Sequence, residues 1–99
     1  MALKVKGKVW RYPGFGGWHF FTVGKRTSSR IKSTMKGQLR GFGSIRTKAR
    51  IGTTEWSTSI FPTKEGTYLL PLKASVRHKE GIDMGDLVVV RLEFPSWNG

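Results

Sequence analysis

Residues 70–90, LPLKASVRHKEGIDMGDLVVV, decide the fold of this chain. They predict a strand that ends near Leu72, a short helical turn over the basic residues 73–80, a turn at Gly85 and Asp86, and a second strand of aliphatic residues that begins at Leu87. Glycine accepts the positive φ that such a turn requires, and aspartate hydrogen-bonds nearby backbone amides. This stretch therefore predicts two strands joined by a short helix.

The first half of the chain repeats the pattern. Residues 17–23, GWHFFTV, precede a basic helical segment, a glycine turn and a strand, and residues 66–72, GTYLLPL, do the same. A further strand precedes each half. We therefore predict a doubled β-β-α-β unit that forms one all-β domain over residues 1–99. It is a small closed or split β-barrel of about six to seven strands, with one or two short helices and pseudo-two-fold symmetry.

Hydrophobic alternation places the individual strands. Between residues 42 and 51, the side chains of Ile45, Thr47, Ala49 and Ile51 are expected to face the interior, and the intervening bases to face solvent. The other strands are expected at residues 3–10, 18–23, 55–61, 68–72 and 87–94, and the tail 95–99 is expected to fray.

A short helix is expected between the second and third strands. Residues 27–29, TSS, offer N-cap side chains, Ile31 and Met35 are spaced to seat one face on the barrel, and Gly37 is expected to end the helix.

Size and charge limit the function. The chain has 99 residues, no cysteine and a formal charge of +12, from 18 Lys and Arg against 6 Asp and Glu. Disulfides and thiolate zinc sites are thereby excluded. An excess of cations attracts polyanions, chiefly nucleic acid, although it also arises from simple solvation of a barrel's outer face. The sequence contains no apolar run of about 18 residues and no apolar secretion signal, so we expect a soluble cytoplasmic protein without a membrane span, as a monomer or a homodimer.

Five blocks of sequence resemble a known family. They are residues 17–20 (GWHF), 40–45 (RGFGSI), 51–62 (IGTTEWSTSIFP), 66–73 (GTYLLPLK) and 76–86 (VRHKEGIDMGD). In this order they are similar to the domain of unknown function numbered nineteen-oh-five, a small prokaryotic β-barrel. The resemblance implies a closed or split barrel with short helices, but no catalytic residues, because the activity of that family is not established. At residues 23–25 (VGK) the chain departs from the family, whose members tend to have an apolar residue followed by proline at this place.

The C-terminal block also resembles, more distantly, one half of the AbrB-type swapped-hairpin transcription regulators and antitoxins. Those proteins bind DNA as dimers of two such halves. The likeness implies that a single chain with both halves would be a monomeric counterpart of such a dimer. Because one fold serves many functions, the likeness extends to the barrel and not to DNA binding.

No catalytic site is predicted. The only imidazoles, His19 and His78, could form a hydrolase trio with Ser57 or Ser59 and Glu55. However, no G-x-S-x-G motif presents a serine nucleophile, and strand serines more often make cross-strand hydrogen bonds. A hydrolase is therefore the least favoured function.

The acidic residues Glu80, Asp83 and Asp86 do not predict a metal site. Their spacing lacks the alternate ligands and the closing glutamate of a calcium loop. A structural role is expected instead, with Asp86 bonding local amides and forming ion pairs beside Arg77 and Lys79. We predict neither a metal nor a cofactor.

The aromatic residues have two interpretations. Trp18 and Trp56 lie on predicted strands, where most such side chains belong to the core. Either could instead line a ligand site or stack on bases, as aromatic residues do in barrels that bind single strands.

Two basic clusters complete the candidate site. One lies on each predicted helical segment, and pseudo-two-fold symmetry would give them equivalent places from which to contact phosphates. The predicted anion-binding residues are Arg26, Arg30, Lys32, Arg40, Lys73, Arg77 and Lys79. We predict a non-enzymatic binding module for an anionic partner, with nucleic acid favoured. The alternatives are a solvated basic face without a partner and an interior pocket for an organic anion, lined by Trp18, Trp56, Arg40 and Arg77.

Overall fold

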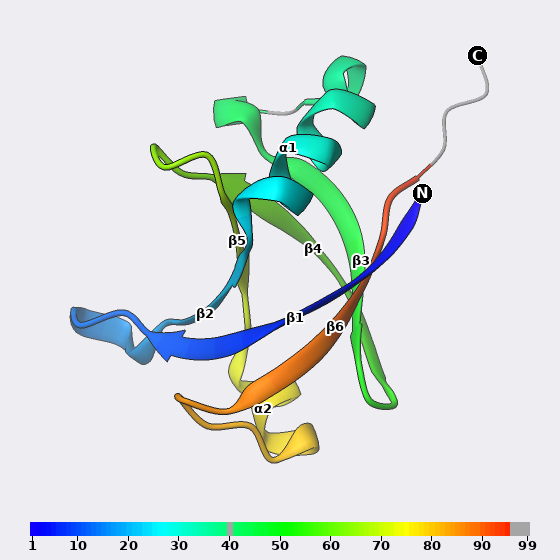
Figure 1. The fold of residues 1–99 in the computed structure, drawn as a ribbon. Helices are drawn as coiled ribbons and strands as arrows, with labels where there is room; N and C mark the ends of the chain where they lie inside the picture. The colour runs from blue at the N-terminus through cyan, green and yellow to red at the C-terminus, as the bar shows by residue number, and fades with distance from the viewer. Residues whose placement is uncertain (40, 96–99) are drawn as a thin grey trace.

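The computed structural model describes residues 1–39 and 41–95, and within them six antiparallel strands close into a barrel (Figure 1). The strands are β1 (Ala2–Arg11), β2 (His19–Val23), β3 (Ile45–Ile51), β4 (Thr54–Pro62), β5 (Tyr68–Pro71) and β6 (Leu87–Glu93). The α-helices are α1 (Lys25–Thr34) and α2 (Ala74–Glu80), and the 3-10 turns are η1 (Phe15–Gly17), η2 (Lys36–Gln38) and η3 (Gly41–Gly43). The predicted small all-β barrel is confirmed.

The strand order, β1-β2-β5-β4-β3-β6, has the predicted pseudo-two-fold symmetry. Exchanging β1, β2 and β3 with β4, β5 and β6 leaves every strand with equivalent neighbours. The symmetry axis therefore crosses the β2–β5 pair and the β3–β6 pair. Phe21 opposes Leu70 in the first pair and Ala49 opposes Leu92 in the second, and all four residues are 0% exposed.

Alternation along the strands fills the barrel interior. In β3, the side chains of Ile45, Thr47, Ala49 and Ile51 are buried and those between them are exposed, as predicted. The Thr47 hydroxyl satisfies its hydrogen bonding by donating to the Glu93 carbonyl at 2.9 Å, which ties β3 to β6. The interior is thus packed with side chains at this level.

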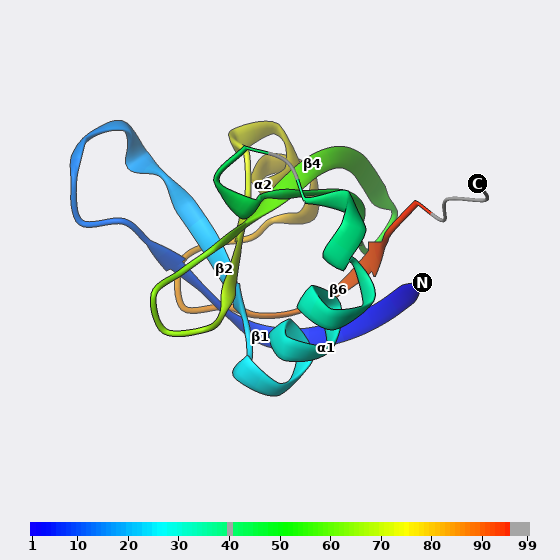
Figure 2. The same ribbon diagram turned by 90° about the horizontal axis from the view of Figure 1, so that it is seen from above.

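The two helices cover opposite ends of the barrel (Figures 1 and 2). α1 buries Ile31, with Met35 buried just beyond its end, and α2 buries Val76. Gly81, with φ of 61°, ends α2 in the left-handed conformation that glycine favours. Within the described residues, neither helix has the length and apolar character needed to cross a membrane.

Each helix begins with the same pattern of hydrogen bonds. The Ser28 amide donates to the Gly24 carbonyl at 2.8 Å, and the Arg77 amide donates to the Lys73 carbonyl at 3.1 Å. Side chains repeat the correspondence, because Ser28 Oγ donates to the Val23 carbonyl at 2.9 Å and Arg77 Nε donates to the Leu72 carbonyl at 3.2 Å. The backbone hydrogen bonds at the start of the two helices are therefore equivalent, but the side-chain donor is a serine hydroxyl in α1 and an arginine guanidinium in α2.

The structure corrects the predicted N-cap at residues 27–29. Helix α1 begins at Lys25, with Gly24 at the N-cap, and Ser28 lies buried inside the helix. Its hydroxyl also accepts a hydrogen bond from the Tyr68 amide at 3.0 Å. The serine is needed to join the ends of β2 and β5, and this tertiary demand outweighs its preference for a cap.

Other boundaries also differ from prediction. The third strand begins at Ile45, not at Phe42, because residues 41–43 form a 3-10 turn in which Phe42 has φ of 59° and is fully exposed. Trp18 precedes β2 and does not lie in it. α1 ends at Thr34, before the predicted stop at Gly37. Of the tail predicted to fray, residues 96–99 lie outside the described part of the chain.

Candidate functional site

An open groove lies between β4 and β5 on the outside of the barrel. The two strands pair only at Phe61 with Leu69 and at Pro62 with Tyr68. Beyond these pairs the two strands separate. The chain just after β5 bonds to β2 instead, because the Leu72 amide donates to the His19 carbonyl at 2.9 Å. We call the resulting opening the aromatic groove. Its volume is about 750 Å³, and it is lined by Tyr12, Trp18, Phe20, Arg46, Ser57, Thr58, Ser59, Phe61, Leu69 and Pro71.

A row of three aromatic rings supports one wall of the aromatic groove, which Phe20 and Trp18 line. Trp10 and Phe20 are cross-strand partners, with ring centroids 5.1 Å apart. Trp18 stacks on Phe20 at 6.2 Å with an interplanar angle of 10°, and it remains 57% exposed. Trp10 Nε1 donates to Thr22 Oγ1 at 2.8 Å, which fixes the base of the stack. The outermost ring, Trp18, is therefore held in place while much of its surface is available for contact.

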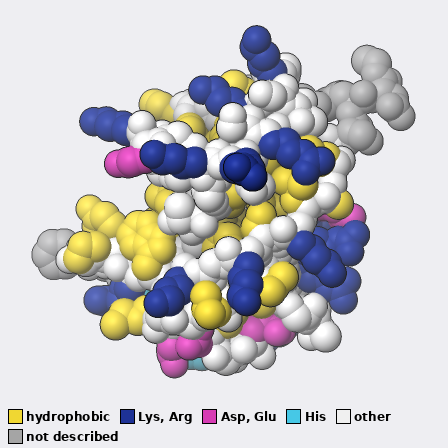
Figure 3. All heavy atoms as spheres, in the orientation of Figure 1, with side chains coloured by type: hydrophobic (Ala, Val, Ile, Leu, Met, Phe, Trp, Pro, Cys, Tyr) yellow, Lys and Arg dark blue, Asp and Glu magenta, His cyan; other side chains and the backbone are white. Residues whose placement is uncertain are grey.

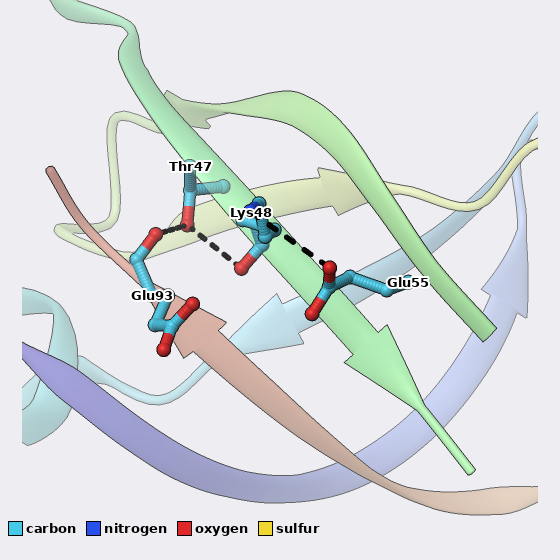
Figure 4. Close-up of polar contacts among 4 residues, drawn as sticks. All are labelled: Thr47, Lys48, Glu55 and Glu93. Atoms are coloured by element: carbon cyan, nitrogen blue, oxygen red, sulfur yellow. Dashed lines mark hydrogen bonds and ion pairs between the residues drawn. The ribbon is translucent and has the colours of Figure 1, made fainter. Parts of the chain in front are cut away.

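Polar residues of β3 and β4 form the opposite side of the groove. Arg46 Nη1 donates to Ser59 Oγ at 3.4 Å, across the β3–β4 pair. Lys48, two residues along β3, lies 3.8 Å from Glu55 (Figure 4). Both members of this ion pair are about half exposed, so the pair contributes little to stability and leaves Lys48 available to solvent.

A second, smaller pocket of about 310 Å³ continues the groove toward α2. It shares Trp18, Ser57, Thr58 and Pro71 with the aromatic groove, and it adds Trp56, Lys73 and Arg77. His19 also lines it, with Nδ1 2.6 Å from the Gly17 carbonyl, a geometry that places a proton on that nitrogen. Trp56 is only 8% exposed and belongs mainly to the core, as predicted.

Helix α1 and the turn after it carry cations and no acid. Between residues 25 and 36 the sequence has five cations and no acid: Lys25, Arg26, Arg30, Lys32 and Lys36. All five side chains are exposed. Arg26 and Arg30 are one helical turn apart, a like-charge spacing that destabilises a helix, and no acid occupies the first turn. Nothing within α1 neutralises this surface.

The α2 end has a balanced charge. Between residues 73 and 86, three cations (Lys73, Arg77, Lys79) accompany three acids (Glu80, Asp83, Asp86). In the face shown in Figure 3, Lys and Arg lie across the α1 end, with an acidic side chain at its left edge, and both acidic and basic side chains lie toward the α2 end. The cations Arg77 and Lys79 lie in the last turn of α2, where the helix dipole favours them.

Two of the three acids at the α2 end have structural partners. Asp86 Oδ2 accepts a hydrogen bond from the Asp83 amide at 2.8 Å, and Gly85 has φ of 90°, as the predicted turn requires. Glu80 Oε2 accepts from Thr54 Oγ1 at 2.6 Å, over a turn where Gly52 has φ of 58° and no Cβ to meet the carboxylate. The predicted ion pairs of Asp86 with Arg77 and Lys79 are wrong. Within the described residues, Lys48 and Glu55 form the single ion pair.

The structure brings together only part of the predicted site. Trp18, Trp56, Lys73 and Arg77 line one pocket. Arg26, Arg30 and Lys32 lie on α1, at the opposite end of the barrel from α2, so the two basic clusters occupy equivalent places at opposite ends (Figure 1). Lys79 is exposed on α2, and Arg40 lies outside the described residues.

Sequence reasoning missed most of the aromatic groove. Phe20 and Phe61 carried a usable signal, because they alternate with the buried Phe21 and Ile60 and must face outward. For Arg46, the alternation along β3 predicts only that the side chain faces solvent. Its place in the groove depends on the separation of β4 from β5, which no local pattern encodes.

The described residues contain no Ser–His hydrogen bond and no cluster of three potential metal ligands. His19 bonds the Gly17 carbonyl and Ser59 bonds Arg46. The absence of catalysis stays a prediction.

Comparison with known proteins gives a family without an activity. Residues 6–92 match the family model described as "Domain of unknown function (DUF1905)", in agreement with the resemblance found in the sequence. No curated protein matches the chain.

Proposed function

The chain belongs to the DUF1905 family, and we propose that it is a non-enzymatic binding module for nucleic acid that acts in the cytoplasm. The observation that carries this proposal is the acid-free cationic surface of α1. Phosphates are the natural partner of such a surface, because each bound Lys or Arg releases counterions from the nucleic acid.

Intrahelical stability does not explain the cations of α1. Lys25 and Arg26 occupy the first turn, where the partial positive charge of the helix dipole disfavours cations. Arg26 also repels Arg30 at the i, i+4 spacing. Sequences that only needed to solvate this helix would do better with acids at these positions. An external polyanion removes both penalties at once.

A salt-titrated binding assay tests the proposal. Fluorescence anisotropy of labelled DNA and RNA strands is measured between about 50 and 200 mM salt, and the affinity is expected to fall steeply as salt increases. No binding at low salt, or binding indifferent to salt, would contradict the proposal.

Two triple variants with equal net charge locate the binding surface. In the first, Arg26, Arg30 and Lys32 are replaced by Gln; in the second, Lys4, Lys6 and Lys8 of β1 are replaced by Gln. The α1 variant is expected to lose about tenfold or more in affinity and to flatten the salt dependence, because it loses phosphate contacts. The β1 variant is expected to change affinity by only about twofold. Equal losses would show that overall charge, and not the α1 surface, drives binding.

A small organic anion is a second candidate ligand. The pocket that joins Trp18 and Trp56 to Lys73 and Arg77 favours it, since it offers a ring surface beside two cations. Binding of an aromatic carboxylate to this pocket, with no salt-dependent nucleic-acid binding, would favour this candidate over the first.

A further inference from the structure

We propose that the aromatic groove holds unpaired bases of a single-stranded nucleic acid, with Trp18 as the outermost stacking platform. This inference rests on the proposed function, and it adds the class of nucleic acid and the place where its bases lie. The phosphates of the same strand lie toward Arg46 at the β3 side and toward Arg77 at the α2 end.

The ring stack is built before any ligand arrives. Trp10 is fixed by its hydrogen bond to Thr22, Phe20 packs on Trp10, and Trp18 lies nearly parallel to Phe20. A base placed against Trp18 extends this stack by one ring and loses little side-chain freedom in the protein. Base–aromatic stacking of this kind tolerates any sequence, because every base has a π-face.

The exposure of Trp18 requires an explanation. It is 57% exposed beside Tyr12, which is 50% exposed, and Phe61, which is 43% exposed. All three line the same groove, so they form a continuous apolar surface and not scattered exposed residues. Hydrophobic side chains gather where the β1–β2 connection projects on the left of Figure 3. A contiguous apolar surface of this kind marks a contact surface.

Charge complementarity selects the occupant. No Asp or Glu is present among the described residues that line the aromatic groove or its smaller pocket, whereas Arg46, Lys73 and Arg77 are. Hydroxyls of Ser57, Thr58 and Ser59 lie between the rings and the β3 cations. Rings on one wall, hydroxyls on the floor and cations at the rim match the bases, sugars and phosphates of one strand.

Stacking on Trp18 favours unpaired bases over a duplex. In a duplex, the faces of internal bases are covered by their neighbours, and only strands whose bases can be splayed out offer them to aromatic side chains. An extended peptide that adds to the free edge of β4 is the competing occupant. The lining, which has Arg46, Lys73 and Arg77 and no Asp or Glu, favours the nucleic acid.

The test compares Trp18→Ala with Leu87→Ala, an exposed apolar residue on β6 at another part of the barrel. The probe is a labelled thymidine strand of about 12 nucleotides, alone and as a duplex with its complement. Trp18→Ala is expected to weaken single-strand binding about tenfold, the size of effect typical of one lost stack, and to leave duplex binding and the salt dependence unchanged. Leu87→Ala is expected to bind both probes as the unmodified chain does.

Each remaining outcome is decisive. If the unmodified chain binds neither probe at low salt, the proposed function itself fails. If it binds both in a salt-dependent way and Trp18→Ala has no effect, the proposed function stands and the groove inference is overturned. A polyglutamate peptide is the third probe. If Trp18→Ala abolishes binding of this peptide but leaves single-strand binding unchanged, the groove binds a peptide and the inference is overturned as well.

Discussion

The α1 and α2 ends of this barrel are two copies of one framework, of which α1 is cationic and α2 has a balanced charge. At each end a strand leads into a helix, and a side chain donates to a backbone carbonyl five residues before it, from Ser28 to Val23 at the end of β2 and from Arg77 to Leu72 just after β5. The α1 copy has five cations without an acid, and the α2 copy has three of each. The shared framework explains the fold, so the difference between the copies points to function.

The two ends also differ in what their charged side chains bond to. At the α2 end, the charged groups serve the helix and its turns: Glu80 bonds Thr54, Asp86 bonds the Asp83 amide, and Arg77 bonds the Leu72 carbonyl. At the α1 end, neutral Ser28 performs the structural task in a buried position, and the exposed cations are left without an intrahelical role. Several charged groups at the α2 end therefore have hydrogen-bond partners within the chain, whereas α1 contains no acid to pair with its cations.

The largest expected effect comes from the two equivalent donors. Ser28→Ala leaves the buried Tyr68 amide and the Val23 carbonyl without their side-chain partner, which should lower the free energy of unfolding by about 2 kcal/mol. Arg77→Met keeps the apolar stem and loses one half-buried bond, so the loss should stay below about 1 kcal/mol. Urea unfolding measures both values.

Equal losses for the two variants would break the comparison. They would show that the buried serine contributes no more than the half-buried arginine, and that the α1 end is not organised around Ser28.

A smaller effect is expected at alkaline pH. Burial raises the pKa of the Tyr68 hydroxyl above its ordinary value of 10.0, because the charged phenolate loses hydration. The folded chain therefore holds this proton more tightly than the unfolded chain. The resulting stability is fully present below about pH 10 and is lost as the pH rises through the folded-state pKa.

Tyr68→Phe isolates this contribution. Urea unfolding at pH 8 and above pH 10 should give a smaller decline for Tyr68→Phe than for the unmodified chain. An identical decline in both proteins would mean that the buried hydroxyl at the α1 end does not contribute to alkaline unfolding.

The sequence predicts the barrel better than the site, for physical reasons. Strand positions follow from alternation, which is local, and the turn at Gly85 and Asp86 follows from backbone chemistry within four residues. Ser28 was misread because serine's preference for caps is also local, whereas its two partners lie on β2 and β5.

Placement of the site needed information that short stretches of sequence do not contain. The helices α1 and α2 follow β2 and β5, and they lie at opposite ends of the barrel because these two strands pair antiparallel. The aromatic groove opens because β4 pairs with β5 over only two residues. Trp18 was expected in a strand, but it lies just before β2, where the chain projects from the barrel and leaves its ring exposed.

The most direct test measures stability and single-strand affinity on the same two variants, Arg26→Glu and Lys79→Glu. Each lowers the net charge equally, so a difference between them reports position. Arg26→Glu should stabilise α1 by about 0.5 kcal/mol, through the helix dipole and a new pair with Arg30, and should weaken strand binding about tenfold. Lys79→Glu should destabilise the protein by about 0.5 kcal/mol and weaken binding by only about twofold. Opposite changes of stability and affinity in Arg26→Glu would support the account, and a loss of both, or equal affinities for the two variants, would contradict it.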